Sequence, residues 1–359
     1  MKILTIIGAR PQFIKASPVS IALSSAGCQE VLIHTGQHYD YGMSQVFFEE
    51  LGMTEPQVNL GIGSGSHGEQ TAGMLVGIER TIQEHQPDWV LIYGDTNSTL
   101  AGALAAVKLH TRVAHVEAGL RSFNRAMPEE INRIVADSVS DLLFAPTTEA
   151  VSNLQRESVP PERVHMVGDV MYDAVLMHGD RSELHSRILD KLGLEAKCFV
   201  LATIHRAENT DSLDRSRVIF EGLGQVSKDT PVVLPLHPRT RFALERNGIL
   251  DMAEQNLRLI EPVGYLDMVK LEKNAALIAT DSGGVQKEAF FHRVPCVTLR
   301  DETEWIELVE MGWNRICPPV SAEGVAAAVR SMLGSEGRDC DPYGAGDASE
   351  KIAAVLKQA

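Results

Sequence analysis

Short runs of apolar, often β-branched residues alternate along the whole chain with longer segments of helical spacing. This alternation is typical of parallel βαβ units. In the first half, the runs predict strands at 2–7, 31–35, 89–93, 112–116 and 142–145, with a sixth left open at 164–167. In the second half, they predict strands at 199–204, 231–236, 258–261, 276–280 and 294–299.

The strand pattern starts again after a polar, helix-prone stretch at 170–197, and 359 residues are enough for two domains. We expect an N-terminal Rossmann-like domain at 1–170 and a C-terminal one at 171–345. A terminal helix at 346–359 follows, and the sequence leaves open which domain it packs on. The predicted fold class is therefore α/β, with two doubly wound domains facing across a cleft. Ligands of such sheets bind outside the carboxyl ends of the strands.

Composition narrows the classes of function. The net charge of −15 disfavours nucleic acid or an anionic membrane as the main partner. The longest apolar runs are shorter than the roughly 18–20 residues of a membrane helix, and the start does not resemble a signal peptide, so we expect a cytoplasmic protein. Five cysteines without a close pair predict neither a disulfide framework nor a metal centre.

A first candidate anion site follows the strand at 2–7. The sequence Gly8-Ala9-Arg10-Pro11 places proline at the first position of a helix, so Arg10 lies at the helix N-terminus and Lys15 about one turn further on. Cationic side chains and free N–H groups at such a point favour an anion. The alternative is a solvated arginine at a turn. The glycine spacing of a dinucleotide fingerprint is absent here.

The clearest phosphate signal is the strand at 276–280, which ends at Asp281 and continues into the turn Ser282-Gly283-Gly284 and a helix. The glycines allow a ligand to approach the backbone, and the helix start presents N–H groups to a phosphate. Glu288 lies one to two turns further along, where it would reach ribose hydroxyls. The alternative is that Asp281 and Ser282 only cap the helix.

Histidines follow two further strands. His205 and Arg206 come after the strand at 199–204, where an imidazole could donate to a diphosphate or carry a proton. His237 follows the strand at 231–236 and opens a segment rich in cations. A lone histidine is more often structural, and that interpretation stays open.

Three acids are predicted at the carboxyl ends of the first domain. Asp95 follows the strand at 89–93 and Glu117 the strand at 112–116. Glu129 is in a helix that begins at Pro128, on the same face as Arg133. Each acid alone is more often a cap or an ion-pair partner, but together they form a candidate acid/base group.

Taken in order, these segments resemble the non-hydrolysing UDP-N-acetylglucosamine 2-epimerase family over essentially the whole chain. The matching motifs are Gly8-Ala9-Arg10-Pro11, Gly94-Asp95-Thr96, His115-Val116-Glu117-Ala118-Gly119-Leu120-Arg121, Pro128-Glu129-Glu130 and Thr280-Asp281-Ser282-Gly283-Gly284. The resemblance implies a glycosyltransferase-B-like fold in which the second domain holds most of the UDP. It also implies a homodimer, no cofactor and no metal.

Carried over position by position, the resemblance assigns the site residues. The substrate and UDP contacts are Arg10, Lys15, Arg133, His205, Arg206, His237, Ser282, Gly283, Gly284 and Glu288. The catalytic acids and bases are Asp95, Glu117 and Glu129, with His205 as a further catalytic candidate. The implied reaction expels UDP from C1 as the C2 proton leaves, and then reprotonates the resulting 2-acetamidoglycal from the opposite face.

The chain departs from the commonest family motifs at Gln12-Phe13, Ala207, 237–241, Met268 and Trp305. We interpret these departures as substrate choice. They are similar to the branch that converts UDP-2,3-diacetamido-2,3-dideoxy-glucuronate to its manno epimer for surface polysaccharide such as the O-antigen of lipopolysaccharide. The alternatives are a UDP-N-acetylglucosamine 2-epimerase, a hydrolysing epimerase, a glycosyltransferase and a non-catalytic nucleotide-sugar sensor.

Overall fold

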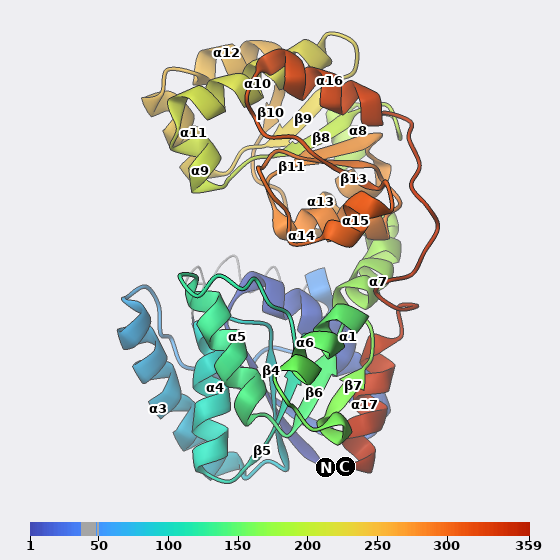
Figure 1. Ribbon diagram of the computed structural model, residues 1–359. Coiled ribbons are helices and arrows are strands. Elements are labelled where there is room, and N and C mark those ends of the chain that lie inside the picture. The colour runs from blue at the N-terminus through green and yellow to red at the C-terminus, as the bar shows by residue number, and fades with distance from the viewer. Residues whose placement is uncertain (37–47, 49) are drawn as a thin grey trace. The chain divides into compact units, whose positions relative to one another are not determined.

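The computed structural model describes residues 1–36, 48 and 50–359. The described chain forms two compact units (Figure 1). Unit 1 comprises Met1–Ala174 with Asp341–Ala359, and unit 2 comprises Val175–Cys340. The division therefore falls inside the helix α7 (Val170–His185), a few residues from the expected boundary at 170, and again before residue 345.

Unit 1 is built on a parallel sheet of seven strands in the order β3-β2-β1-β4-β5-β6-β7. The strands are β1 (Lys2–Ile7), β2 (Gln29–His34), β3 (Val58–Asn59), β4 (Trp89–Tyr93), β5 (Arg112–Val116), β6 (Leu142–Ala145) and β7 (Val164–Met166). The strand order reverses at β1, which pairs with both β2 and β4. Ligands bind at such a reversal in doubly wound sheets.

The helices of unit 1 connect its strands, apart from the C-terminal helix α17. They are α1 (Arg10–Ser25), α3 (His67–His85), α4 (Asn97–Lys108), α5 (Pro128–Val139), α6 (Thr148–Arg156) and α17 (Ala348–Gln358), with a 3-10 turn at Pro161–Arg163. Helix α4 lies close against the sheet, because a Cβ on its Gly102 would come within 2.8 Å of Ile6 and 3.0 Å of Ile92. This packing brings the start of α4 to the carboxyl end of β4.

Unit 2 repeats the arrangement with six parallel strands in the order β10-β9-β8-β11-β12-β13. The strands are β8 (Val200–Thr203), β9 (Val232–Pro235), β10 (Arg258–Ile260), β11 (Leu277–Thr280), β12 (Cys296–Thr298) and β13 (Asn314–Ile316). The order reverses at β8, which pairs with β9 and β11. The predicted class of two doubly wound α/β domains is confirmed.

Most helices of unit 2 lie between its strands in the chain, with α8 before the first strand and α16 after the last. They are α8 (Ile188–Leu192), α9 (Ala207–Thr210), α10 (Leu213–Ser227), α11 (Pro238–Arg246), α12 (Leu250–Asn256), α13 (Tyr265–Asn274), α14 (Gly283–Phe291), α15 (Ile306–Glu310) and α16 (Ala322–Met332). The start of α14 follows β11 directly, as the Ser-Gly-Gly turn predicts.

The sequence analysis missed two strands, β3 and β13. Both are at a sheet edge and both are very short, with two and three residues. Central strands such as β4 and β11 are buried along their full length and read as continuous apolar runs. An edge strand has one covered side and carries polar residues, so its pattern is weak.

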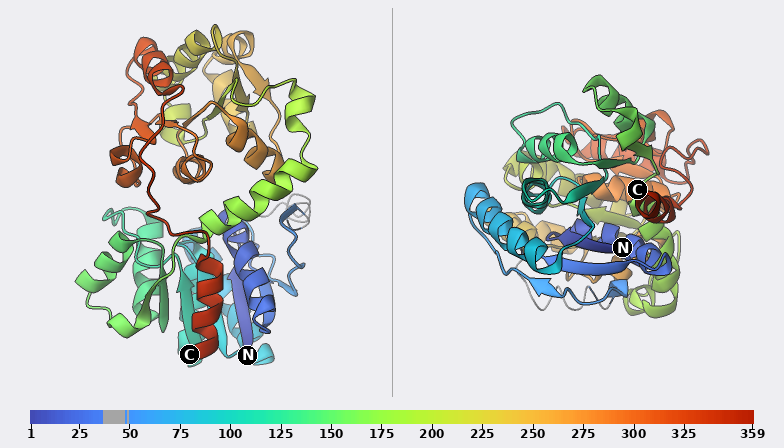
Figure 2. Two further views of the ribbon diagram at one scale, coloured as in Figure 1. Left: turned by 90° about the vertical axis from the view of Figure 1, so that its right-hand side faces the viewer. Right: turned by 90° about the horizontal axis from the view of Figure 1, so that it is seen from below.

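The terminal helix α17 packs on α1 within unit 1, close to the N-terminus of the chain (Figure 2). The Asp173 carboxylate accepts hydrogen bonds from the Ser349 N–H at 2.7 Å and the Ser349 hydroxyl at 2.6 Å. Burial outweighs these bonds and raises the pKa of Asp173. These contacts answer the question of the helix's partner that the sequence left open.

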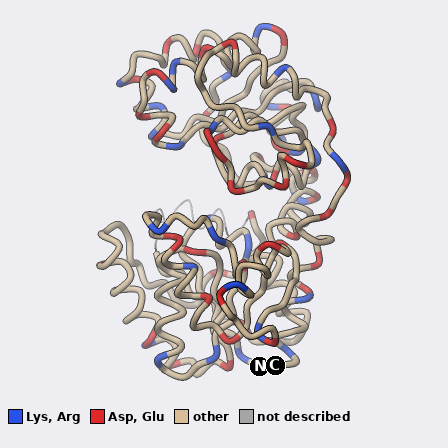
Figure 3. The backbone as a smooth tube through the Cα atoms, in the orientation of Figure 1, with Lys and Arg blue, Asp and Glu red and all other residues tan. Residues whose placement is uncertain are grey.

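Lys and Arg positions are mixed with Asp and Glu positions over both units, so the negative net charge is spread along the described chain (Figure 3). None of the helices in the described ranges combines the length and the hydropathy needed to span a bilayer.

Candidate active site

The residues predicted from the first half of the chain gather at the carboxyl edge of the unit 1 sheet. Arg10 is the first residue of α1, immediately after β1. Asp95 and Glu117 follow β4 and β5, which pair with each other, and β4 also pairs with β1. The three adjacent strands therefore deliver a cation and two carboxylates to one edge.

The Gln12 side chain connects the ends of β1 and β4 by hydrogen bonds. Its side-chain oxygen accepts from the N–H groups of Gly8 at 2.8 Å and Ala9 at 3.0 Å, and its amide donates to the Tyr93 carbonyl at 2.8 Å. Gln12 and its neighbour Phe13 are both only 2% exposed. Gln12 thus ties β1 to β4 and Phe13 is part of the core, which gives both residues a structural role. That the pair also marks substrate choice stays a prediction. A glutamate at position 12 would lack the donor for Tyr93.

Glu117 forms an ion pair with Lys15 of α1, between Oε2 and Nζ. Its backbone has a φ of +70°, which is rare for a residue with a side chain. The pair needs the glycine at position 94, because a Cβ there would lie 3.3 Å from Glu117 Oε2 and 3.6 Å from Lys15 Nζ. Strained, tightly surrounded carboxylates of this kind are typical of functional sites.

Arg133 of α5 connects Asp95 to a second carboxylate. Its guanidinium pairs with Asp95 Oδ2, and its Nη1 is 3.2 Å from Glu130 Oε2. The sequence analysis placed Glu129 on the face of Arg133, but the partner is Glu130. Glu129 lies exposed in the first turn of α5.

Glu130 is 1% exposed and was not proposed from the sequence as a site residue. Its carboxylate accepts from the Ser122 N–H and hydroxyl, each at 2.9 Å, and from the Phe123 N–H at 3.0 Å. Burial alone would raise its pKa, but these bonds and the Arg133 charge outweigh burial and lower it. Glu130 thus anchors the loop before α5, and nothing in its local sequence distinguishes it from Glu129.

In unit 2, Asp281 organises the loop after β8. The fully buried carboxylate accepts from the N–H groups of His205 at 3.1 Å and Arg206 at 3.1 Å, and from the Asn209 amide at 3.1 Å. The His205 ring has 51% of its side chain exposed and places Nδ1 3.4 Å from Asp281. The main role of Asp281 is therefore not to cap the helix, as we considered, but to fix the loop at 205–209 by hydrogen bonds.

Ser282 is the N-cap of α14, with its hydroxyl accepting from the Val285 N–H at 3.5 Å. Ser282 therefore caps the helix, and its role toward a phosphate stays a prediction. The following turn is fixed by Trp305, whose indole donates to the Gly283 carbonyl at 2.9 Å. Lys287 lies over the same indole, 4.4 Å from the ring centroid. Gly284 is exposed and Glu288 half-buried on this helix.

The remaining predicted residues of unit 2 lie at neighbouring strand ends. His237 follows β9 and caps α11, its Nδ1 accepting from the Arg239 N–H at 3.2 Å. Arg206 is 3.5 Å from Glu304, which also binds Arg300 at 2.8 and 3.0 Å. Burial would raise the pKa of Glu304, but the Arg300 bonds outweigh it and lower the pKa. Met268 is half-buried against an apolar cluster.

Within the residues that the structure describes, no group of three or more His, Cys, Asp and Glu side chains is arranged to hold a metal ion. The side chains at these sheet edges are mainly carboxylates and cations. In unit 1, the Asp95 and Glu117 carboxylates each form an ion pair with a cationic side chain. In unit 2, the N–H groups at the start of a helix lie beside His205.

Comparison with known proteins agrees with this geometry. Residues 22–357 match the family described as UDP-N-acetylglucosamine 2-epimerase. A UDP-2,3-diacetamido-2,3-dideoxy-D-glucuronate 2-epimerase from Pseudomonas aeruginosa is 50% identical over 99% of both chains. A UDP-N-acetylglucosamine 2-epimerase from Methanocaldococcus jannaschii is 45% identical over 99% of both.

The solved structures give the same result. The crystal structure of Methanocaldococcus jannaschii UDP-GlcNAc 2-epimerase in complex with UDP-GlcNAc and UDP has a TM-score of 0.89 to this chain. The match covers 100% of both chains at 44% identity. This likeness confirms the predicted glycosyltransferase-B-like fold class.

Proposed function

Since this chain belongs to the UDP-N-acetylglucosamine 2-epimerase family, we propose that it inverts C2 of UDP-2,3-diacetamido-2,3-dideoxy-D-glucuronate to give the manno epimer. The observation that carries this choice of substrate is the 50% identity over 99% of both chains to the Pseudomonas aeruginosa enzyme of that name. The second candidate substrate is UDP-N-acetylglucosamine, favoured by the 45% identity to the Methanocaldococcus jannaschii enzyme.

The C2 hydrogen of these sugars is not next to a carbonyl, so no enolate is available. In the proposed reaction, a carboxylate takes the C2 proton while the bond from C1 to the diphosphate oxygen breaks and its electron pair leaves with UDP. The carbons C1 and C2 are then joined by a double bond. An acid delivers a proton to the other face of C2, and the diphosphate oxygen adds back to C1.

The proton transfers are assigned to unit 1. Asp95, Glu117 and Glu129 are the proposed acids and bases, because two of them end adjacent strands and the third begins α5. Lys15 and Arg133 orient Glu117 and Asp95 through the ion pairs described above. General acid and base groups contribute about 10²–10⁴-fold each to such reactions.

The uridine diphosphate is assigned mainly to unit 2. The N–H groups of the turn Ser282-Gly283-Gly284 would bind a phosphate at the start of α14. The half-exposed His205 would donate to the leaving diphosphate, with Arg206, His237 and Arg10 as further cationic or polar contacts. Glu288 would accept from the ribose hydroxyls. Such donors stabilise negative charge as it develops on the leaving group.

Proton NMR in deuterated buffer tests the proposal. The protein is given UDP-2,3-diacetamido-2,3-dideoxy-glucuronate in one sample and UDP-N-acetylglucosamine in another. We expect the manno epimer, with deuterium at C2, in the first sample only. Turnover in the second sample only would contradict the proposed substrate and leave the reaction type standing. Free sugar would indicate a hydrolysing epimerase, and a lack of reaction in both would favour the transferase or sensor.

Replacing Ser282 by Ala is expected to weaken UDP binding by about 3- to 10-fold, because a lost N-cap costs about 0.5–2 kcal/mol. The substitution removes the cap from the start of α14, which binds the phosphate in our proposal. Isothermal titration with UDP measures the effect.

The matched control is Ser321→Ala. Ser321 caps α16 in the same unit, with its hydroxyl accepting from the Gly324 N–H at 3.1 Å. We expect a similar loss of stability with unchanged UDP affinity. Equal losses of affinity in the two variants would contradict a phosphate site at α14.

By the family resemblance we also propose a cytoplasmic homodimer whose product enters surface polysaccharide such as the O-antigen of lipopolysaccharide. Sedimentation at equilibrium tests the dimer directly, and a single species of 39.2 kDa would contradict it.

A further inference from the structure

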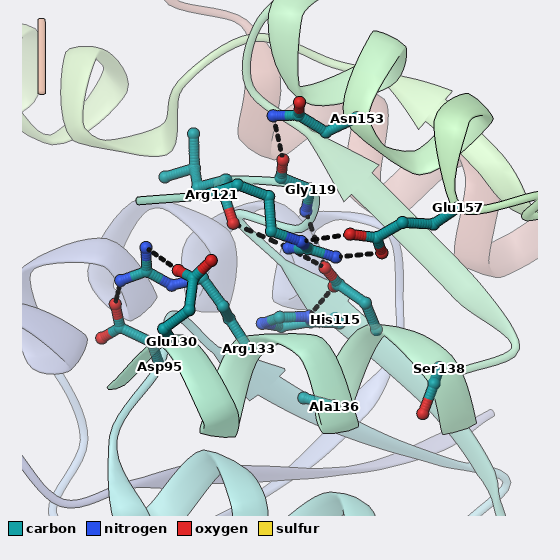
Figure 4. A network of polar contacts seen from close by, with 12 residues as sticks. Asp95, His115, Gly119, Arg121, Glu130, Arg133, Ala136, Ser138, Asn153 and Glu157 are labelled. Carbon is teal, nitrogen blue, oxygen red and sulfur yellow. Dashed lines mark hydrogen bonds and ion pairs between the residues drawn. The ribbon is translucent and has the colours of Figure 1, made fainter. Parts of the chain in front are cut away.

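His115 of β5 is fully buried, and it lies in a network of polar contacts with Gly119, Arg121 and Glu157 (Figure 4). Both of its ring nitrogens are bonded. Nε2 lies 2.7 Å from the Gly94 carbonyl oxygen, and Nδ1 lies 2.7 Å from Asp137 Oδ1. A carbonyl oxygen can only accept, so Nε2 must carry a hydrogen.

The second nitrogen, Nδ1, shares a hydrogen bond with the buried Asp137 carboxylate. Burial alone would raise the pKa of Asp137, but the bond and charge of His115 and those of Arg121 outweigh burial and lower it. Through these two bonds the ring of His115 connects the Gly94 carbonyl to the Asp137 carboxylate.

Asp137 of α5 collects three donors at the centre of this network. Besides His115, its carboxylate accepts from the Gly119 N–H at 3.0 Å and pairs with Arg121 at 2.7 Å. Arg121 continues to Glu157, the residue that follows α6, at 2.6 Å. The chain of polar contacts is buried up to Glu157, whose side chain is 39% exposed.

The network ends on the two turns that carry the proposed acids. The Gly94 carbonyl precedes Asp95, and Gly94 has a φ of +62°. The Gly119 N–H comes two residues after Glu117, and Gly119 has a φ of +83°. A Cβ on Gly119 would be 2.5 Å from the Ala150 carbonyl oxygen, so the turn is closely packed as well. One buried histidine–aspartate pair therefore holds both turns.

We propose that His115 and Asp137 are positioning residues of the epimerisation, which hold the Asp95 and Glu117 carboxylates in register through the Gly94 carbonyl and the Gly119 N–H. The proposal rests on the proposed function, because that function gives those two acids the proton transfers. His115 itself does not contact the sugar.

Stability alone does not account for the pair. A buried ion pair is often no more stabilising than apolar residues of the same volume, whereas its removal from one side is costly. Here the His115 ring bonds directly to the turn at Gly94. Its other bond goes to Asp137, which holds the turn at Gly119. Misplacement of a reacting group by about 1 Å costs about 10²-fold in rate.

The test compares His115→Gln and Asp137→Asn with the wild type on the UDP-sugar that the wild type turns over. We expect kcat to fall about 10²-fold in both, while KM and the Kd for UDP stay within about threefold. Asp141→Asn is the matched control, because that carboxylate accepts from the Val113 N–H at 2.8 Å at the opposite end of β5. Its kcat should equal the wild-type value.

A folded His115→Gln variant with wild-type kcat would overturn the positioning role, and so would equal losses in kcat and UDP affinity. An inactive wild type would instead contradict the proposed function. If both variants misfold, long-range proton–nitrogen NMR of ¹⁵N-histidine-labelled wild type at pH 7.5 decides. For His115 we expect an imidazole that carries a hydrogen on Nε2 and is protected from exchange with water, and its absence would overturn the proposal.

Discussion

Replacing Glu117 by Gln is expected to lower kcat by about 10²–10⁴-fold, while the Kd for UDP changes by less than about threefold. Glutamine keeps the size of the side chain and removes the charge that takes or returns the C2 proton. The Lys15 ion pair is lost at the same time, so Lys15 is left beside a neutral amide. Kinetics with the natural sugar nucleotide and titration with UDP measure the two quantities separately.

Deuterium exchange at C2 sharpens this test. A general base that serves one face of C2 is needed for deuterium exchange in at least one of the two epimers. In Glu117→Gln, the rates of exchange and of epimerisation should therefore fall together. Glu149→Gln serves as the control, because Glu149 is an exposed carboxylate of α6 paired with Arg156 at 2.5 Å. Wild-type turnover in Glu117→Gln would remove this residue from the chemistry.

Asp281→Ala is expected to destabilise unit 2 by about 3–5 kcal/mol and to weaken UDP binding at least about tenfold. The substitution leaves the N–H groups of His205 and Arg206 and the Asn209 amide without their shared acceptor. A buried donor without a partner costs about 1–3 kcal/mol. The loop that presents His205 would then lose its anchor.

Urea unfolding followed by UDP titration checks both parts. A chain of two units need not unfold in one step, so the transition that UDP shifts is the one to compare. The control Asp301→Asn removes an exposed partner of Arg215, 3.1 Å away, and should cost at most about 1 kcal/mol. A loss below about 1 kcal/mol for Asp281→Ala would show that the loop has other support.

Most of the fold could be predicted from the apolar runs. The central strands of both sheets are buried on both faces, so their residues must be apolar over four or more positions, and the pattern is local. The short edge strands β3 and β13 lack this constraint, and both were missed.

The placement of Arg10, Asp95 and Glu117 at one sheet edge could also be predicted, because they follow apolar runs directly and parallel strands bring their carboxyl ends together. Which of two neighbouring carboxylates is buried could not be predicted from the sequence. Glu129 and Glu130 look alike in the sequence, yet one is exposed in the first turn of α5 and the other is buried under the loop at Ser122.

Which polar side chains meet is a property of the folded chain, because the partners lie far apart in sequence. Gln12 reaches the Tyr93 carbonyl across 81 positions, and Asp281 reaches the His205 N–H across 76. His115 reads as an ordinary strand residue until α5 brings Asp137 beside it. Strand positions and family follow from local pattern and motif order, whereas the supports of the acids arise only when the sheet aligns separate strand ends and places helices against them.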